Sequence, residues 1–225
     1  IYDEAYSPLE GFPVTISENS NVLPYPLNIA DIEQDGTKEV IFATNEHSGG
    51  YYIYTFDIKG KEKGKIKVKE KVFAHIKFND MDNDGNLEYI FADFEGNLHV
   101  TDIKGNALDG FPVKAGERIK GAPFVLDTDG DGKCEILVVT WRESDSNGTL
   151  KVYDSKGKNA GDDHDLGPIS KILINRDVFL ADLDGNGLLE LLKIGDDKLK
   201  VEETEYRVPV VIEKIYSNTS YGSGD

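Results

Sequence analysis

Asp127-Thr-Asp-Gly-Asp-Gly-Lys-Cys-Glu135 is an acidic loop of nine residues, and the apolar run Ile136-Leu-Val-Val139 follows it directly. The same pair of an acidic loop and an apolar run occurs three more times. The other loops are Asp31-Ile-Glu-Gln-Asp-Gly-Thr-Lys-Glu39, Asp80-Met-Asp-Asn-Asp-Gly-Asn-Leu-Glu88 and Asp182-Leu-Asp-Gly-Asn-Gly-Leu-Leu-Glu190. Their first aspartates are 49, 47 and 55 residues apart, a spacing typical of repeats that each form one supersecondary unit.

Short segments with the composition of β-strands surround each loop. One precedes the loop, as at Ala122 to Leu126, and the apolar run after the loop is a second. A third alternates apolar and polar residues, as at Leu98 to Asp102. After a glycine turn, Gly110 to Val113 is predicted to close the unit as an edge strand, where a proline is tolerated. Four such repeats predict an all-β chain, a β-propeller of four-stranded antiparallel blades; a solenoid or a stacked sandwich is the alternative.

The two ends of the chain bear on how the repeats close. The segment Pro8 to Val14 matches Ala107 to Val113, although no repeat precedes it. The first segment either pairs with the last blade and fastens the ring or is donated to a neighbouring copy. The last repeat has its own candidate closing strand at Arg207 to Val211, which favours donation. Four repeats fit a closed four-bladed ring, part of a larger propeller, or half of a dimeric ring. The predicted organisation is a closing or donated strand at 1–16, the propeller at 17–216 and a flexible tail at 217–225.

The acidic loops have the chemistry of a calcium site. Acidic or amide side chains recur at positions 1, 3, 5 and 9, and position 6 is always glycine, which permits a sharp turn. Position 7 varies, as expected of a residue that offers only its backbone carbonyl. The sequence predicts up to four bound Ca²⁺ ions, one in each loop. The predicted ligands are Asp31, Glu33, Asp35, Thr37 and Glu39; Asp80, Asp82, Asp84, Asn86 and Glu88; Asp127, Asp129, Asp131, Lys133 and Glu135; and Asp182, Asp184, Asn186, Leu188 and Glu190.

An EF-hand is excluded for these loops, because it requires a glutamate at position 12 between two helices. Position 12 is Phe42, Phe91, Val138 or Lys193, and the glutamate at position 9 opens a strand instead. Like charges about 4 Å apart repel by about 4 kcal/mol at an effective dielectric constant near 20, so a bound divalent ion would relieve each loop. The competing interpretation is a set of polar hairpin turns, and the first loop departs most from the pattern because Glu33 is longer than aspartate.

The motif Asp-x-Asp-x-Asp-Gly-x-x-Glu, followed by an apolar strand at a spacing of about 50 residues, resembles the FG-GAP/VCBS-type repeats of integrin α-subunit propellers and many microbial surface proteins. The segments Leu9 to Val14 and Leu108 to Val113 are similar to those of microbial members. The resemblance covers residues 8 to about 215. It implies calcium at the four loops and an extracellular or cell-surface location, and it implies no catalytic activity. Such propellers usually have seven or eight blades, whereas four repeats are counted here.

Composition narrows the class of partner. A net charge of -17 argues against nucleic acid and anionic membranes, and no apolar run is long enough to insert into a bilayer. The one cysteine, Cys134, is predicted to be a buried small hydrophobe. The sequons at Asn147 and Asn218 carry little weight, since such tripeptides arise by chance. A chain that starts at Ile1 is expected of a processed form or an excised segment.

Three functions remain open. The first is a non-catalytic adhesion or recognition module, which binds a protein or a glycan through loops at Asn45 to Tyr52 and Trp141 to Asn147; Trp141 either stacks on a sugar or caps the core. The second is a structural subunit that binds copies of itself, as a surface filament formed by strand donation. The third is the propeller of a polysaccharide-active enzyme, which we do not expect because the four histidines are scattered and no nucleophile motif occurs.

Overall fold

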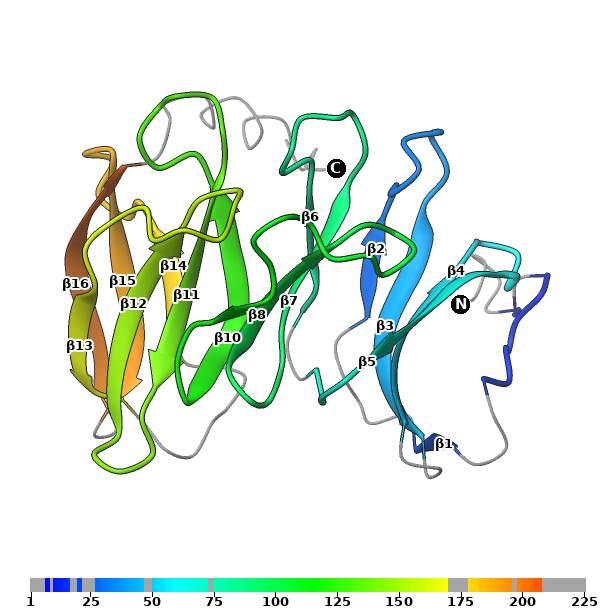
Figure 1. Cartoon of the computed structure of the whole chain (residues 1–225), viewed down its shortest axis with the longest axis horizontal. Helices are drawn as coiled ribbons and strands as arrows, with labels where there is room; N and C mark the ends of the chain where they lie inside the picture. Colours follow the sequence, from blue (N-terminus) through cyan, green and yellow to red (C-terminus); the bar gives the residue numbers. More distant parts are fainter. Residues whose placement is uncertain are drawn as a thin grey trace, which may run out of the picture.

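The computed structural model describes residues 7–8, 10–16, 20–21, 27–46, 50–72, 75–169, 178–195 and 198–207. These residues form sixteen β-strands in four antiparallel sheets (Figure 1). The all-β class and the division into four sheets are therefore as predicted. Among the described residues, no helix is present that could cross a membrane.

The sheets follow one another along the chain. Sheet 1 has the order β1-β3-β4-β5, and β2 also pairs with β3; its strands are β1 (Ser20–Asn21), β2 (Asn28–Ala30), β3 (Glu39–Glu46), β4 (Gly50–Phe56) and β5 (Glu62–Val68). Sheet 2 consists of β6 (Lys77–Asn79), β7 (Glu88–Ala92), β8 (Asn97–Thr101) and β9 (Val113–Lys114). Sheet 3 consists of β10 (Arg118–Leu126), β11 (Glu135–Trp141), β12 (Asn147–Tyr153) and β13 (His164–Pro168). Sheet 4 consists of β14 (Val178–Ala181), β15 (Leu188–Gly195) and β16 (Lys198–Arg207).

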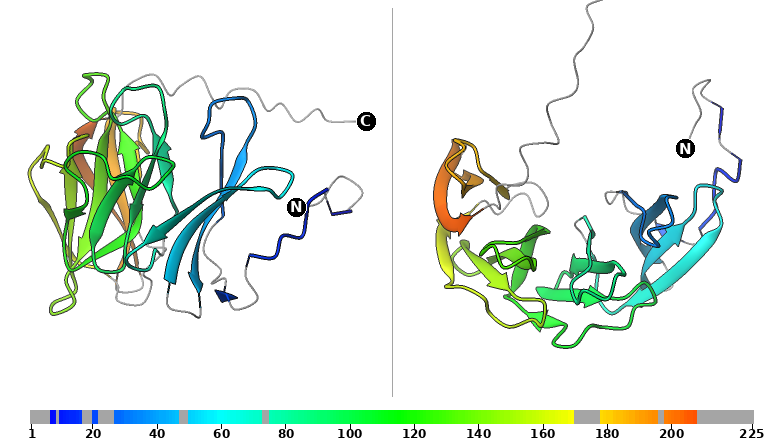
Figure 2. Two further views of the ribbon diagram at one scale, coloured as in Figure 1. Left: turned by 45° about the vertical axis from the view of Figure 1, so that its right-hand side comes forward. Right: turned by 90° about the horizontal axis from the view of Figure 1, so that it is seen from above.

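The four sheets stand side by side in an arc, with sheet 1 at one end and sheet 4 at the other (Figure 2). Within the part of the chain that the structure describes, the sheets do not close into a ring. The prediction of a propeller is thus supported only as far as an array of antiparallel sheets. Each acidic loop connects the first two strands of the array's repeating unit, so that all four loops occupy equivalent places.

The sheets are held together by apolar side chains that point alternately to the two faces of each strand. On β7, Tyr89 and Phe91 pack in the core between sheets 1 and 2, while Ile90 and Ala92 pack in the core between sheets 2 and 3. A third core between sheets 3 and 4 includes Leu137 and Leu191. A strand that is buried on both faces has apolar residues at consecutive positions. For this reason, the strand after each acidic loop is a continuous apolar run rather than an alternation of apolar and polar residues.

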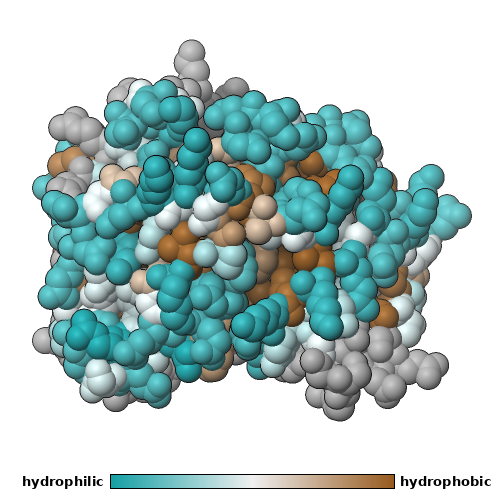
Figure 3. Space-filling model, in the orientation of Figure 1, coloured by the Kyte–Doolittle hydropathy of each residue, from teal (hydrophilic) through white to brown (hydrophobic). Residues whose placement is uncertain are grey.

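On the face shown in Figure 3, hydrophilic side chains cover most of the surface, and the hydrophobic ones that remain visible gather near its middle. The closing segment differs from the prediction, since β9 contains only Val113 and Lys114 rather than Gly110 to Val113. Gly110 has a φ of 91° and lies in a turn, and Pro112 has no N–H to donate to a ladder. The expected strand after Arg207 and the expected tail at 217–225 lie outside the described residues.

Candidate metal centres

The backbone of each acidic loop is shaped by its first aspartate and its sixth-position glycine. In the second loop, the Asp80 Oδ1 and Oδ2 atoms accept hydrogen bonds from the N–H groups of Asp84 (3.1 Å) and Gly85 (3.0 Å). The φ of Gly85 is 88°, which a residue with a Cβ adopts only under strain. The other loops have the same bond from the sixth residue to the first, from Gly36 to Asp31 (2.9 Å), Gly132 to Asp127 (2.9 Å) and Gly187 to Asp182 (3.0 Å).

The ninth-position glutamate is buried in every loop and returns to the start of its own loop. Glu88 is 2% exposed, and its Oε2 accepts a hydrogen bond of 2.7 Å from the N–H of Met81, the second loop residue. The equivalent bonds run from Ile32 to Glu39 (3.1 Å), Thr128 to Glu135 (2.7 Å) and Leu183 to Glu190 (2.6 Å). Because the glutamate lies on the strand after the loop and bonds to the loop's second residue, this hydrogen bond closes the loop.

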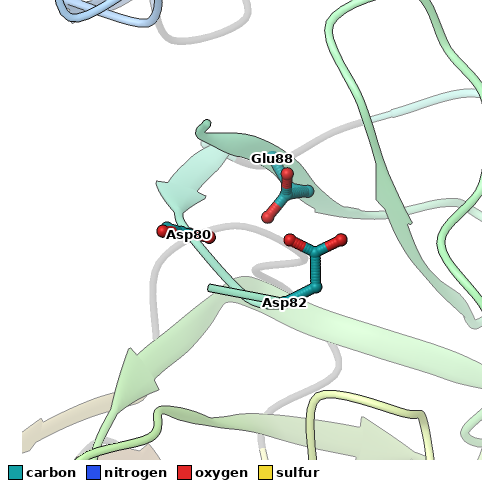
Figure 4. A group of neighbouring side chains, drawn as sticks. All are labelled: Asp80, Asp82 and Glu88. Atoms are coloured by element: carbon teal, nitrogen blue, oxygen red, sulfur yellow. The ribbon is translucent and has the colours of Figure 1, made fainter. Parts of the chain in front are cut away.

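Three of the loops bring carboxylates together as the sequence predicts. Their ligand atoms at positions 1, 3 and 9 all lie within 4.8 Å of one another. In the second loop, the Asp82 and Glu88 carboxylates point toward one another with Asp80 beside them (Figure 4). The three clusters are Asp80, Asp82 and Glu88; Asp127, Asp129 and Glu135; and Asp182, Asp184 and Glu190. Each could hold a metal ion.

The electrostatics of these clusters favour a cation. The pKa of Glu88 is raised to about 7, mainly by burial and also by the negative charges of Asp82, Asp80 and Asp84, while the hydrogen bond from Met81 opposes the rise. Burial also raises the pKa of Glu39 in the first loop, with Glu33 and Asp35 adding to the effect. A carboxylate that resists ionisation for these reasons gains most from a positive charge placed next to it.

The fourth loop contains the clearest sign of a missing partner. Glu190 is 6% exposed, and among the described residues no hydrogen-bond donor reaches its buried Oε1, although its Oε2 is satisfied by Leu183. A buried oxygen without a partner costs about 1–3 kcal/mol, and carboxylates almost never remain so in folded proteins. Because Asp182 and Asp184 converge on the same point, the donor set fits a hard cation that takes oxygen ligands.

The first loop differs, since its predicted ligands do not form such a cluster among the described residues. Glu33 instead pairs with Lys63 on β5, with Nζ 2.7 Å from Oε2. The longer side chain of glutamate reaches this lysine, and the loop therefore keeps the fold of a metal loop but not its third-position ligand. The clusters that could hold a metal thus number three in the described chain, against the four loops predicted.

The fifth-position residues make hydrogen bonds within their own loops. Asp84, Asp131 and Asn186 each accept a hydrogen bond from the N–H of the seventh residue, at 2.7–2.8 Å. The seventh-position side chains include Lys133, whose Nζ lies 3.3 Å from the Asp131 carboxylate. These hydrogen bonds shape the loop turn.

A second set of aspartates was not predicted from the sequence. These aspartates lie in the last hairpin of sheets 1, 2 and 3, between β4 and β5, β8 and β9, and β12 and β13. Asp57, Asp102 and Asp154 each accept two backbone hydrogen bonds from the residues two and four positions later, at 2.8–2.9 Å. The repeated tetrapeptide Asp-x-Lys-Gly is the signal that could have revealed them. They are turn residues rather than metal ligands.

Trp141 lies at the end of β11 and packs against the core between sheets 3 and 4, with Lys120 Nζ 5.4 Å from its ring centroid. This placement agrees with the interpretation that Trp141 caps the core. Loop 142–146 beside it is closed by an ion pair between Arg142 and Asp145 (3.2 Å). The other predicted contact loop, Asn45 to Tyr52, includes the end of β3 at Glu46 and the start of β4 at Gly50. Residues 47–49 between them lie outside the described residues.

The remaining single residues have structural roles. His99 donates or accepts a hydrogen bond of 2.8 Å with buried Asp93 and stacks on Phe91, with ring centroids 4.8 Å apart. Cys134 is partly buried against the core between sheets 2 and 3, and burial raises the pKa of its thiol. A hollow of about 530 Å³, which the sequence did not suggest, lies between the second and third acidic loops and is lined by both.

Of the comparisons with known proteins, a family model gives the match that bears on this site. A solved structure of a protein of unknown function from Bacteroides caccae is 15% identical, covers 83% of this chain and 68% of its own, and has a TM-score of 0.43, a level of similarity that carries no functional information. No curated protein matches the chain. The family model of the FG-GAP-like repeat matches residues 127–192, which contain the third and fourth acidic loops. Residues 127–192 are thus an FG-GAP-like repeat segment, as the resemblance of the acidic loops predicted.

Proposed function

We propose that the chain is a calcium-stabilised, non-catalytic module, an array of propeller-type blades that presents a ligand-binding surface outside the cell. The observation that carries the calcium part is the convergence of two aspartates and one buried glutamate in each of the loops at 80–88, 127–135 and 182–190. The unpartnered Glu190 Oε1 supports it. All the converging donors are oxygens, which Ca²⁺ and Mg²⁺ prefer and which softer metals do not.

Calcium suits these loops better than magnesium. Ca²⁺ accepts six to eight oxygens in irregular geometry, whereas Mg²⁺ requires a near-ideal octahedron and keeps most of its water. Three carboxylates per loop, together with backbone carbonyls and water, can supply the larger set. The role of the ion would be structural: it would join the strand before the loop to the strand that carries the ninth-position glutamate.

The recognition part rests on the surface beside the loops. The hollow between the second and third loops is lined by Met81, Asp82, Asp129, Lys133 and Lys156, among others, and so offers both signs of charge next to an apolar side chain. Loops on a rigid scaffold commonly carry binding residues. An extracellular location suits weak structural sites, because extracellular modules bind Ca²⁺ at about 10⁻⁴–10⁻³ M.

Thermal unfolding of the chelator-stripped chain, titrated with Ca²⁺ and with Mg²⁺ as the control, tests the calcium part. An ion that binds only the native state raises the unfolding midpoint as its concentration rises, so we expect a calcium-selective increase. An unchanged midpoint would mean that the loops are only turns. Screening the calcium-loaded and the stripped chain against glycan and protein arrays tests recognition; we expect ligand binding that the chelator abolishes, and no ligand in either state would contradict it.

A further inference from the structure

The contact between neighbouring sheets repeats along the array. In the strands that follow the second and third acidic loops, β7 and β11, positions 10 and 12 face the preceding sheet and positions 11 and 13 face the following one, as Tyr89 and Ile90 do on β7. Every interior sheet therefore has one face built to meet a predecessor and another built to meet a successor. The two end sheets each have one such face with no neighbouring sheet in the described chain.

The outward face of sheet 4 exposes apolar residues whose counterparts are buried. Val201 on β16 pairs with Leu192 and is 51% exposed, whereas Val152, at the same place in sheet 3, is 1% exposed beneath sheet 4. Leu183, the second residue of its acidic loop, is 54% exposed, whereas Met81 in the second loop is 3% exposed. This face therefore has the side chains that a following sheet would cover.

The outward face of sheet 1 has the complementary residues. Leu27 is 63% exposed, and its counterpart Ile76, four residues before the next acidic loop, is 2% exposed. Ile29 is 66% exposed, whereas its counterpart Phe78 packs in the core between sheets 1 and 2. Together with Ile58 on the hairpin of sheet 1, these residues are all the large hydrophobic side chains that are exposed in the described part of the chain.

Residues 10–16 lie beside sheet 1 as the segment that ends sheet 2 lies beside sheet 3. A side chain added at Gly11 would collide with the Lys59 carbonyl of the sheet 1 hairpin, just as one at Gly110 would collide with the Lys156 carbonyl of the sheet 3 hairpin. Val14 packs against the outward face of sheet 1. Since Gly110 belongs to the segment that ends sheet 2, residues 10–16 lie as if they ended a sheet that precedes sheet 1.

We propose that sheet 4 of a second copy of this chain is that preceding sheet. Sheet 4 has three strands among the described residues, with β16 at its edge. Residues 14–15 of one copy would pair with β16 of the other, as β9 pairs with β8 through Asn97 and Lys114, and the outward faces would cover one another. Because each copy contributes one face of each kind, the contact is head-to-tail, and two open arcs close into a ring of two copies.

The test uses the calcium-loaded chain and two double variants. Leu27→Ser with Ile29→Ser removes the apolar groups of the sheet 1 end, and Leu183→Ser with Val201→Ser removes those of the sheet 4 end. Ala107→Ser with Ala160→Ser changes exposed residues of the interior sheets and is the control. The masses are measured by sedimentation over a range of concentrations, and circular dichroism checks that each variant is folded.

We expect the unchanged chain and the control to have twice the monomer mass of 24.9 kDa, and each double variant to dimerise at least tenfold more weakly. An equimolar mixture of the two double variants should associate more strongly than either alone, because it restores one intact contact. A monomeric unchanged chain overturns the proposal. So does a loss of association in only one double variant, or a mixture that stays as weak as its components.

Discussion

Glu190 accepts a hydrogen bond of 2.6 Å from the N–H of Leu183 through one carboxylate oxygen, while the other oxygen is buried with no donor in the described part of the chain. The same glutamate lies on β15 and forms one cluster with Asp182 and Asp184. One oxygen thus closes the loop, and the same carboxylate belongs to a cluster that could hold a metal ion.

Glu190→Gln should separate these two roles. The amide oxygen can still accept the bond from Leu183, and the amide N–H groups can donate to the neighbouring aspartates, so we expect the metal-free variant to be more stable by about 1 kcal/mol, or about 2–4 °C in the unfolding midpoint. Calorimetric titration should lose one of three calcium sites. Glu62→Gln, an exposed change on β5, is the control, and an unchanged stoichiometry in Glu190→Gln would refute the site.

Lys63→Met should give the first acidic loop a metal site. The 2.7 Å pair between Lys63 and Glu33 holds the third-position carboxylate away from its loop, and burial with nearby carboxylates leaves Glu39 in need of a positive charge. Without the lysine, we expect calorimetry to count four calcium ions instead of three. Lys61→Met on the same hairpin should leave three. If Lys63→Met also binds three, the length of Glu33 rather than its partner excludes the ion.

Met81→Ala and Leu183→Ala compare one loop position in two environments. Met81 is 3% exposed and packs between sheets 2 and 3, whereas Leu183 is 54% exposed. Truncation of a buried methionine costs about 2–5 kcal/mol, and an exposed truncation changes stability by less than about 0.5 kcal/mol. Urea unfolding, at a concentration where the chain is monomeric, should show this difference; equal costs would mean that the outward face of sheet 4 is covered within one chain.

Asp93 should make the fold sensitive to acid. Burial alone would raise its pKa, but hydrogen bonds from His99 and Asn97 outweigh burial and lower the pKa below the ordinary value of 3.8. A lowered native pKa gives stability that is present above pH 3.8 and is lost as the pH falls through the native value. Asp93→Asn should therefore be destabilised by about 1–3 kcal/mol at neutral pH.

The loss in Asp93→Asn should shrink as the pH falls below about 4, because the native carboxylate then gains the proton that the amide variant never needs. Urea unfolding between pH 3 and pH 7 measures this, and Asp109→Asn, an exposed turn residue, is the control. A loss that does not change with pH would show that packing, rather than the ionised hydrogen bonds of Asp93, stabilises the turn.

The sequence alone determined the features that depend on nearby residues. Glycine at position 6 permits the turn, aspartate at position 1 caps it, and the glutamate at position 9 lies within reach of the second N–H, so each loop closes by itself. The apolar runs predicted strands, and the spacing of the loops predicted four repeats. All these bonds span at most seven residues, and a linear pattern is enough to specify them.

Only the tertiary structure decided which loops bring their carboxylates together and which apolar side chains are buried. Lys63 is 30 residues from Glu33 in sequence and removes it from the first loop, a competition that no loop motif contains. Met81 and Leu183 share one position in the repeat, yet one is buried and the other exposed, because burial depends on whether another sheet lies beside the strand. Position in the array, rather than the repeat pattern, therefore sets the environment of each side chain, since packing between sheets is a contact between residues far apart in the chain.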